Sequence, residues 1–95
     1  MSISDSACEI EEERLRKIKE LIAELGQDWT ERFEPGSQGC HELLDRTNLA
    51  ADHVERYVLD HPACMRNAEW YSLAEQAVTA LRELYQHIGS EHLSQ

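Results

Sequence analysis

Apolar residues recur at intervals of three and four across residues 67–89, and this periodicity restricts the possible folds of the chain more than any other feature. One face of a helix here would carry Trp70, Ala74, Ala77, Leu81, Leu84 and Ile88. The apolar surface is widened by Leu73, Val78 and Tyr85. Asn67 suits the start of such a helix and Gly89 suits its end. We therefore expect a helix over residues 67–89 that contacts partners on more than one side.

The same spacing predicts a second helix from about Cys40 to His61, between Gly39 and Pro62. Its apolar stripe consists of Leu44, Thr47, Ala51, Val54, Val58 and His61. Alanines recur in the middle of this helix and of the one that follows, which favours a close approach of the two. The connection between them is short, so the sequence predicts an antiparallel helical hairpin.

A further helix is predicted at the amino end, over Ser6 to Leu25. Ser6 and Glu9 have the spacing of a capping box, in which each side chain accepts a hydrogen bond from the other's free backbone N–H. The apolar positions Leu15, Ile18, Ile22 and Leu25 follow helical spacing, and Gly26 ends the segment. Acidic residues gather in its first two turns, where the helix dipole favours negative charge.

Residues 26–39 are predicted to form a connector that carries two large aromatic side chains. Asp28 and Glu31 can cap a single turn holding Trp29, with Phe33 on the same side, and Pro35-Gly36 forces a turn. These aromatic side chains either cover the open end of the helix bundle or form part of a partner-binding surface. Residues 1–5 and 90–95 are polar terminal segments that we expect to be flexible.

The length and charge of the chain limit its functions. Its 95 residues predict one domain, 1–95, with a thin core, since a chain of this size buries only about 60–65% of its unfolded surface. The net charge is −10 and is spread evenly, with about −5 in residues 1–38 and the same in residues 39–95. Direct binding to nucleic acid is disfavoured, because that mode needs clustered Lys and Arg. A basic protein partner is compatible with this surface.

The cysteine content indicates a reducing compartment. There are three cysteines, an odd number, and none forms a CxxC pair. No apolar segment approaches the roughly 18 residues of a membrane span, and none resembles an export signal. We therefore expect a cytoplasmic protein that does not enter a membrane.

Two arrangements of histidines suggest metal binding. Cys40-His41 and His61…Cys64 carry zinc ligands, but the intervening helix would separate the pairs by about 30 Å. His53, Tyr57 and His61 line one side of the second helix and could combine with Glu69 or Glu75. That set lacks the Glu-x-x-His motif of carboxylate-bridged metal bundles, so it stays an alternative and no cofactor is expected.

The predicted fold is all-α: an antiparallel three-helix bundle, a long helical hairpin plus the amino-terminal helix, completed by dimerisation. The residues expected to face a partner or second copy are Trp70, Tyr71, Val78 and Tyr85, with Trp29 and Phe33. Because no catalytic constellation is evident, we expect a non-enzymatic protein-protein interaction module: an adaptor, inhibitor or chaperone-like regulator. The alternatives are a helical-bundle protein that binds a metal or small ligand, and an acidic decoy that mimics DNA.

Overall fold

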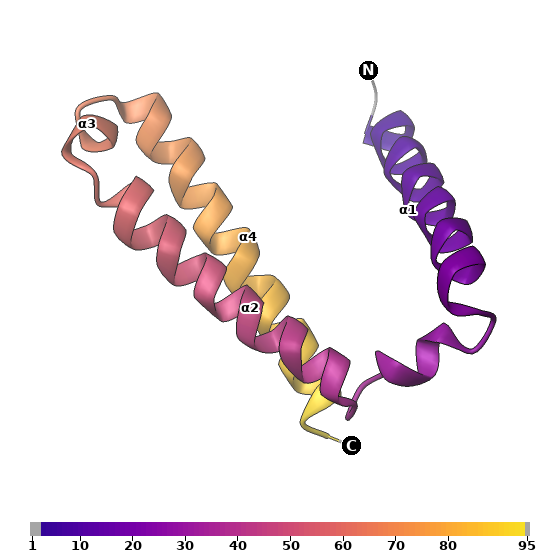
Figure 1. The fold of residues 1–95 in the computed structure, drawn as a ribbon. Helices are drawn as coiled ribbons and strands as arrows, with labels where there is room; N and C mark the ends of the chain where they lie inside the picture. Colours follow the sequence, from indigo (N-terminus) through magenta and orange to yellow (C-terminus); the bar gives the residue numbers. More distant parts are fainter. Residues whose placement is uncertain (1–2, 95) are drawn as a thin grey trace. The chain divides into compact units, whose positions relative to one another are not determined.

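The computed structural model describes residues 3–94, with the backbone alone for residues 3–6, and in this part of the chain it contains helices and no strand. The helical elements are α1 (Ile3–Leu25), the 3-10 turn η1 (Trp29–Arg32), α2 (Gln38–Val54), the π-helical segment η2 (Glu55–Leu59), α3 (Pro62–Met65) and α4 (Ala68–His92) (Figure 1). They form two compact units, Met1–Glu31 and Arg32–Gln95. The all-α class is thus confirmed.

The first unit is built on α1. This helix already includes Ile3, so Ser6 lies within it, and the prediction that a Ser6 cap starts the helix is wrong. Its predicted end is confirmed, because Gly26 has a φ of +97° and its N–H donates to the carbonyl of Ile22 at 2.8 Å. Part of the expected flexible segment, residues 1–2, lies outside the described residues.

The exposed side of α1 carries ion pairs between successive turns. Arg16 binds Glu13 and also Glu20, the latter at 2.5 Å, while Arg14 binds Glu11. Hydrogen bonds from Arg14 and Arg16 lower the pKa of Glu11 and Glu13 below the ordinary value of a glutamate. Such exposed pairs contribute little to stability, typically ~0–1 kcal/mol each.

The second unit is an antiparallel hairpin of α2 and α4, which lie side by side and are joined by α3 (Figure 1). The predicted cap at Asn67 is confirmed, since its Oδ1 accepts a hydrogen bond from the Trp70 N–H at 3.0 Å. Ser37 caps α2 in the same way by accepting from the Cys40 N–H at 3.1 Å. The hairpin is the part of the predicted bundle that the structure establishes, and packing of α1 against it stays a prediction.

Small and medium side chains form the seam between α2 and α4. The buried apolar residues are Cys40, Leu44, Ala51, Leu59, Ala74 and Val78. Leu81, Tyr85 and Ile88 are half-buried on the same side of α4 as Ala74 and Val78, at intervals of three and four. Ala51 is the most buried of them at 1% exposed, and no large side chain among them is fully buried. The hairpin therefore has a seam but no enclosed core, as expected for two helices without a third.

The π-helical segment η2 shifts the apolar stripe of the second predicted helix by one residue. The N–H of Asp60 donates to the carbonyl of Glu55 at 2.9 Å, which is an i to i−5 bond. The wider turn places Leu59 in the core at 4% exposed and leaves Val58 outside at 46%. The prediction that Val58 and His61 belong to the buried stripe is wrong for this reason.

The carboxyl end of α4 is ordered by a buried histidine. His92 is 8% exposed, and its Nδ1 accepts a hydrogen bond from the Gly36 N–H at 2.8 Å. The helix runs through Gly89 to His92, so the predicted end at Gly89 is wrong, as is a flexible segment beginning at residue 90. The cause is a tertiary contact, since the bond joins residues 56 positions apart.

The connector forms the predicted turns. Gly36 has a φ of +89°, and the N–H of Ser37 donates to the carbonyl of Glu34 at 3.0 Å, with Pro35 between them. The ring of Phe33 lies against Gly39 in the first turn of α2. Phe33 therefore covers the start of α2, although its side chain remains 45% exposed.

Two glycines in helices provide a test of this packing. A Cβ at Gly39 would overlap the carbonyl oxygen of Arg32 and the ring of Phe33, whereas a Cβ at Gly89 would make an ordinary 3.7 Å contact with Leu44. We expect Gly39→Ala to destabilise the protein by about 1–3 kcal/mol and Gly89→Ala to stabilise it by up to about 1 kcal/mol. Urea unfolding followed by circular dichroism measures both, and equal effects would contradict this packing.

Candidate functional site

Helix α4 carries two apolar stripes, and only one of them is buried. The first stripe, through Ala74 and Val78, faces α2. The second stripe is exposed and consists of Trp70, Leu73, Ala77 and Leu84. Trp70 is 57% exposed, Leu73 58% and Leu84 46%. An exposed apolar stripe of this length is uncommon on a monomer and is typical of an interaction surface.

Helix α2 and η2 extend this exposed surface. Leu43 and Ala50 are spaced by seven and so share one side. Because the π turn of η2 adds one residue, Val58 takes the next position on that side, with Tyr57 beside it. Leu43, Tyr57 and Val58 are exposed, and Ala50 is half-buried. We call the combined surface the apolar face; it comprises Leu43, Ala50, Tyr57, Val58, Trp70, Leu73, Ala77 and Leu84.

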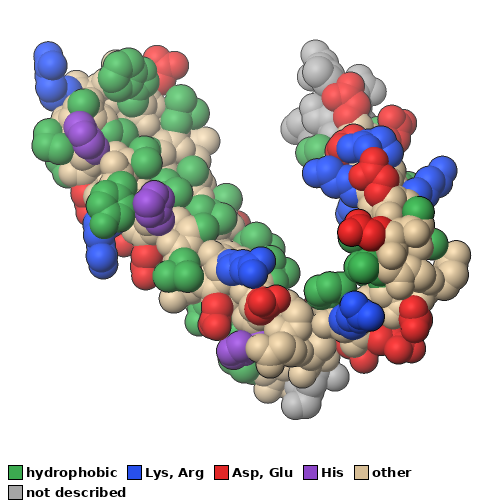
Figure 2. All heavy atoms as spheres, in the orientation of Figure 1, with side chains coloured by type: hydrophobic (Ala, Val, Ile, Leu, Met, Phe, Trp, Pro, Cys, Tyr) green, Lys and Arg blue, Asp and Glu red, His purple; other side chains and the backbone are tan. Residues whose placement is uncertain are grey.

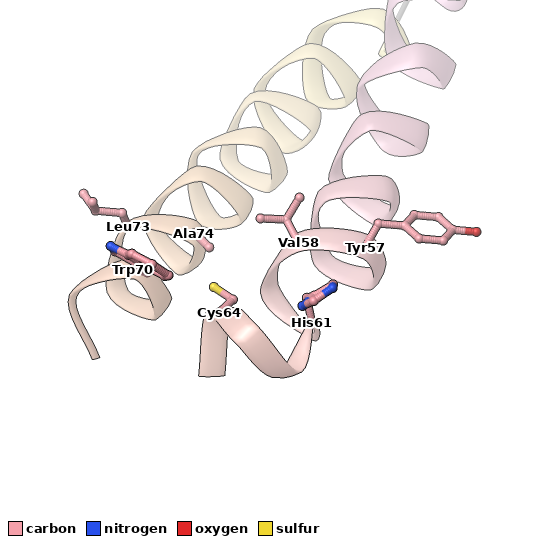
Figure 3. Close-up of a pocket in the computed structure, with 7 residues that line it drawn as sticks. All are labelled: Tyr57, Val58, His61, Cys64, Trp70, Leu73 and Ala74. Carbon is pink, nitrogen blue, oxygen red and sulfur yellow. The ribbon is translucent and has the colours of Figure 1, made fainter. Parts of the chain in front are cut away.

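The apolar face is hollowed at the end of the hairpin that carries α3. An open groove of about 530 Å³ is lined there by Tyr57, Val58, His61, Cys64, Trp70, Leu73 and Ala74. In Figure 3, Cys64 of α3 lies between the two long helices, Val58 points toward α4, and the Tyr57 ring projects outward. The groove brings together residues from α4 and from η2, which confirms that their exposed stripes lie on one side of the hairpin.

The opposite side of the hairpin is polar. Arg82 binds Glu55 at 3.0 Å and Asp52 at 3.4 Å, which links α4 to α2 and η2. Arg82 and Leu84 are two residues apart, about 200° around a helix, as are Asp52 and Ala50. Consequently the ion pairs and the apolar face lie on different sides. Figure 2 shows hydrophobic side chains gathered over the hairpin around α3.

The titratable groups near the groove have structural roles. The Nδ1 of His61 accepts a hydrogen bond from the Ala63 N–H at 3.0 Å and so caps α3. The His53 ring packs on Tyr57, with a centroid distance of 4.8 Å. Glu75 accepts a hydrogen bond from Thr79.

The structure does not assemble the metal site that the sequence suggests as an alternative. Among the described residues, no group of three His, Cys, Asp or Glu side chains is placed to hold a metal ion. The proposed ligands His53, His61, Glu69 and Glu75 are all exposed and do not form such a group. The groove can therefore bury apolar groups, but it offers no described ligand set for a cation.

The residues of α4 that were predicted to face a partner lie on two different stripes of the helix. Trp70 belongs to the apolar face. Tyr71, Val78 and Tyr85 lie on the other stripe, where Val78 is only 3% exposed, Tyr85 is half-buried and Tyr71 is 40% exposed. The expectation that Val78 faces a partner is wrong, because it packs against Leu59 and Ala74 inside the hairpin. A Val78→Glu substitution would place a charge in the seam and could not report on a dimer.

The aromatic residues of the connector fall in different units. Trp29 is half-buried at the end of the first unit, and Phe33 begins the second. Both take part in interactions within the structure. Their role in partner binding stays a prediction.

Helical spacing placed Leu84 on the main apolar stripe and Leu73 beside it, and neither was among the residues predicted to face a partner. The two stripes of α4 are adjacent and about equally apolar, so helical spacing alone does not show which one faces α2. Arg82 was the available signal, because it is the single Lys or Arg between residues 68 and 92. An arginine two residues from Leu84 could have been matched to Asp52 and Glu55, which would have oriented the helix.

Comparison with protein-family models, curated proteins and solved structures found no match for this chain. Over the described residues, none of the helices combines the length and the apolar character that crossing a bilayer requires.

The wide turn of η2 predicts that substitutions of two neighbouring residues reduce the stability by different amounts. Leu59→Ala should destabilise the hairpin by about 2–4 kcal/mol, because it leaves a cavity in the seam, while Val58→Ala should cost less than about 1 kcal/mol. Urea unfolding of the two variants measures the difference. A larger effect at Val58 would show that the regular spacing persists in solution and that the π turn is absent.

Proposed function

We propose that this chain is a non-catalytic protein-protein interaction module, acting as an adaptor, an inhibitor or a chaperone-like regulator, and that it binds through the apolar face of the hairpin. The observation that supports this most is the second apolar stripe of α4, which the hairpin leaves exposed while it buries the first. While this stripe is exposed, its large apolar side chains remain hydrated, which is unfavourable in free energy compared with burying them against a partner.

The energetics of the apolar face suit protein binding. Fully burying a large apolar side chain contributes about 1.5–3 kcal/mol, and several such side chains lie together here. Trp70 and Tyr57 belong to the residue types that dominate binding energy at protein interfaces. The open groove between them has the form of a site for one anchoring apolar side chain of a partner.

The shape of the face favours a helical partner. Its apolar residues repeat along the two helices at helical spacing, so a third helix can lie along them and present its own residues at i, i+3, i+4 and i+7. The net charge of −10 makes a basic or neutral helix a better partner than an acidic one.

Two sources of such helices belong to this protein itself. Helix α1 has an apolar stripe and would complete a three-helix bundle, while a second copy of the hairpin would form a homodimer. Both continue the expectation that a thin hairpin needs additional helices to complete its core. The proposed function requires that the apolar face be bound, whichever helix binds it.

The proposal predicts that a charge on the apolar face abolishes binding without unfolding the hairpin. Tagged wild-type chain, used as bait in an extract of its native cells, should capture a protein that Leu73→Glu loses, because a buried unpaired carboxylate opposes association. Mass spectrometry identifies the captured proteins, including untagged copies of this chain.

The matched control is Ser72→Glu, which adds the same charge one residue away on the exposed polar side of α4. This variant should retain the partner. Circular dichroism should show unchanged helix content for both variants. Equal capture by wild type and Leu73→Glu would rule out the apolar face as the binding surface.

A further inference from the structure

The apolar face has the repeat of a four-helix bundle. Leu43, Ala50 and, after the extra residue of the π turn, Val58 follow one side of α2 and η2, and Trp70, Ala77 and Leu84 are spaced by seven along α4. Two antiparallel helices with a seven-residue apolar repeat on one side form half of a four-helix bundle. The occupant that matches this face over its whole length is therefore another pair of helices.

A second copy of this chain supplies such a pair. The eight residues of the face are uncharged, and the first charge along the α4 repeat is Glu91, at the end of the face, so two copies can pack on it without burying an unpaired charge. Each copy would gain the enclosed core that the single hairpin lacks, since no large side chain of its seam is fully buried. A symmetric dimer uses the same surface on both copies, which requires a self-complementary surface of this kind.

The charged residues beside the face distinguish two possible symmetric dimers. The edge of α4 carries Glu69, Glu83 and Glu91. The edge of α2 is mixed, because Arg46 and His53 lie beside Glu42, which Arg46 binds at 3.5 Å. If α4 packed on α4 of the second copy, acidic edges would meet. If α4 packs on α2 of the second copy, each acidic edge meets the edge that carries Arg46, and like-charge repulsion is avoided.

The register of the hairpin locates the pairs that would form. His41 lies level with His92, with ring centroids 5.5 Å apart, and Asp52 lies level with Arg82. A twofold axis parallel to the helices keeps every residue at its own level. By this register Arg46 falls within about one turn of Glu91 of the second copy, and His53 falls beside Glu83 of the second copy.

We infer that a second copy of this chain covers the apolar face, in a symmetric four-helix bundle in which α2 of each protomer packs on α4 of its partner. The inference rests on the proposed function and names the partner. It assigns the Trp70 groove to the dimer core and Arg46 with Glu91 to its edges.

Analytical ultracentrifugation of the full chain, from low micromolar to submillimolar concentration, tests the assembly. The wild type should sediment as a dimer at the upper concentrations, and Leu73→Glu should sediment as a monomer. Arg46→Glu should weaken the dimer about tenfold, because two symmetric pairs change from attraction to repulsion. The double variant Arg46→Glu with Glu91→Arg should restore the wild-type dissociation constant to within about threefold.

The control is Arg56→Glu, which changes the net charge by the same amount as Arg46→Glu but lies away from the apolar face. This variant should leave the dissociation constant of the dimer unchanged. A wild type that sediments as a monomer at every concentration overturns the inference, including the case in which α1 of the same chain covers the face. A dimer that Leu73→Glu leaves intact, or one that the double variant fails to restore, overturns the assigned arrangement.

The capture experiment separates this inference from the function on which it rests. A monomeric wild type whose bait captures a different protein, lost with Leu73→Glu, contradicts the dimer and supports the interaction module. Loss of both the dimer and the Leu73-dependent capture contradicts both.

Discussion

The close contact between α2 and α4 is the interaction on which the rest of this structure depends. It is possible because the seam is lined by alanine and other small or medium side chains, with Ala51 only 1% exposed and Ala74 9%. Helices that approach over alanine gain dispersion contacts but bury little area per residue. The contact therefore holds the hairpin together while it leaves most of the large apolar side chains outside, and this imbalance is the physical basis of the proposed function.

Different interactions hold the helices together at the two ends of the hairpin. At the α3 end, the π turn of η2 turns Leu59 inward and the helix α3 closes the seam with Cys64, so the fastening is apolar. At the other end, the imidazole of His92 accepts a hydrogen bond from the connector backbone at Gly36. The apolar groove lies at the first end and the buried polar contact at the second, so the two ends bury groups of different chemistry.

Much of the architecture could be predicted because local signals and tertiary packing agree. The helical spacing, the Asn67 cap, the Gly26 end and the Pro35-Gly36 turn all depend on interactions within a few residues. The errors occur where a distant contact decides. Helix α4 continues beyond Gly89 because a hydrogen bond between His92 and Gly36 orders its last turn. Leu59 is buried in place of Val58 because one turn of the helix is wider than an α-helical turn.

The sequence by itself determined the class of structure, the approximate helices, the hairpin and the excess of apolar residues over the core that two helices can form. Those features follow from composition and from periods of three and four. Only the tertiary structure decided which stripe of α4 faces α2, and thereby that Val78 is buried while Leu73 and Leu84 are exposed. The reason is that both stripes are apolar and lie only about 60° apart around the helix axis. Helix propensity does not depend on such a rotation of the helix. Packing against α2 and the Arg82 ion pairs determine it.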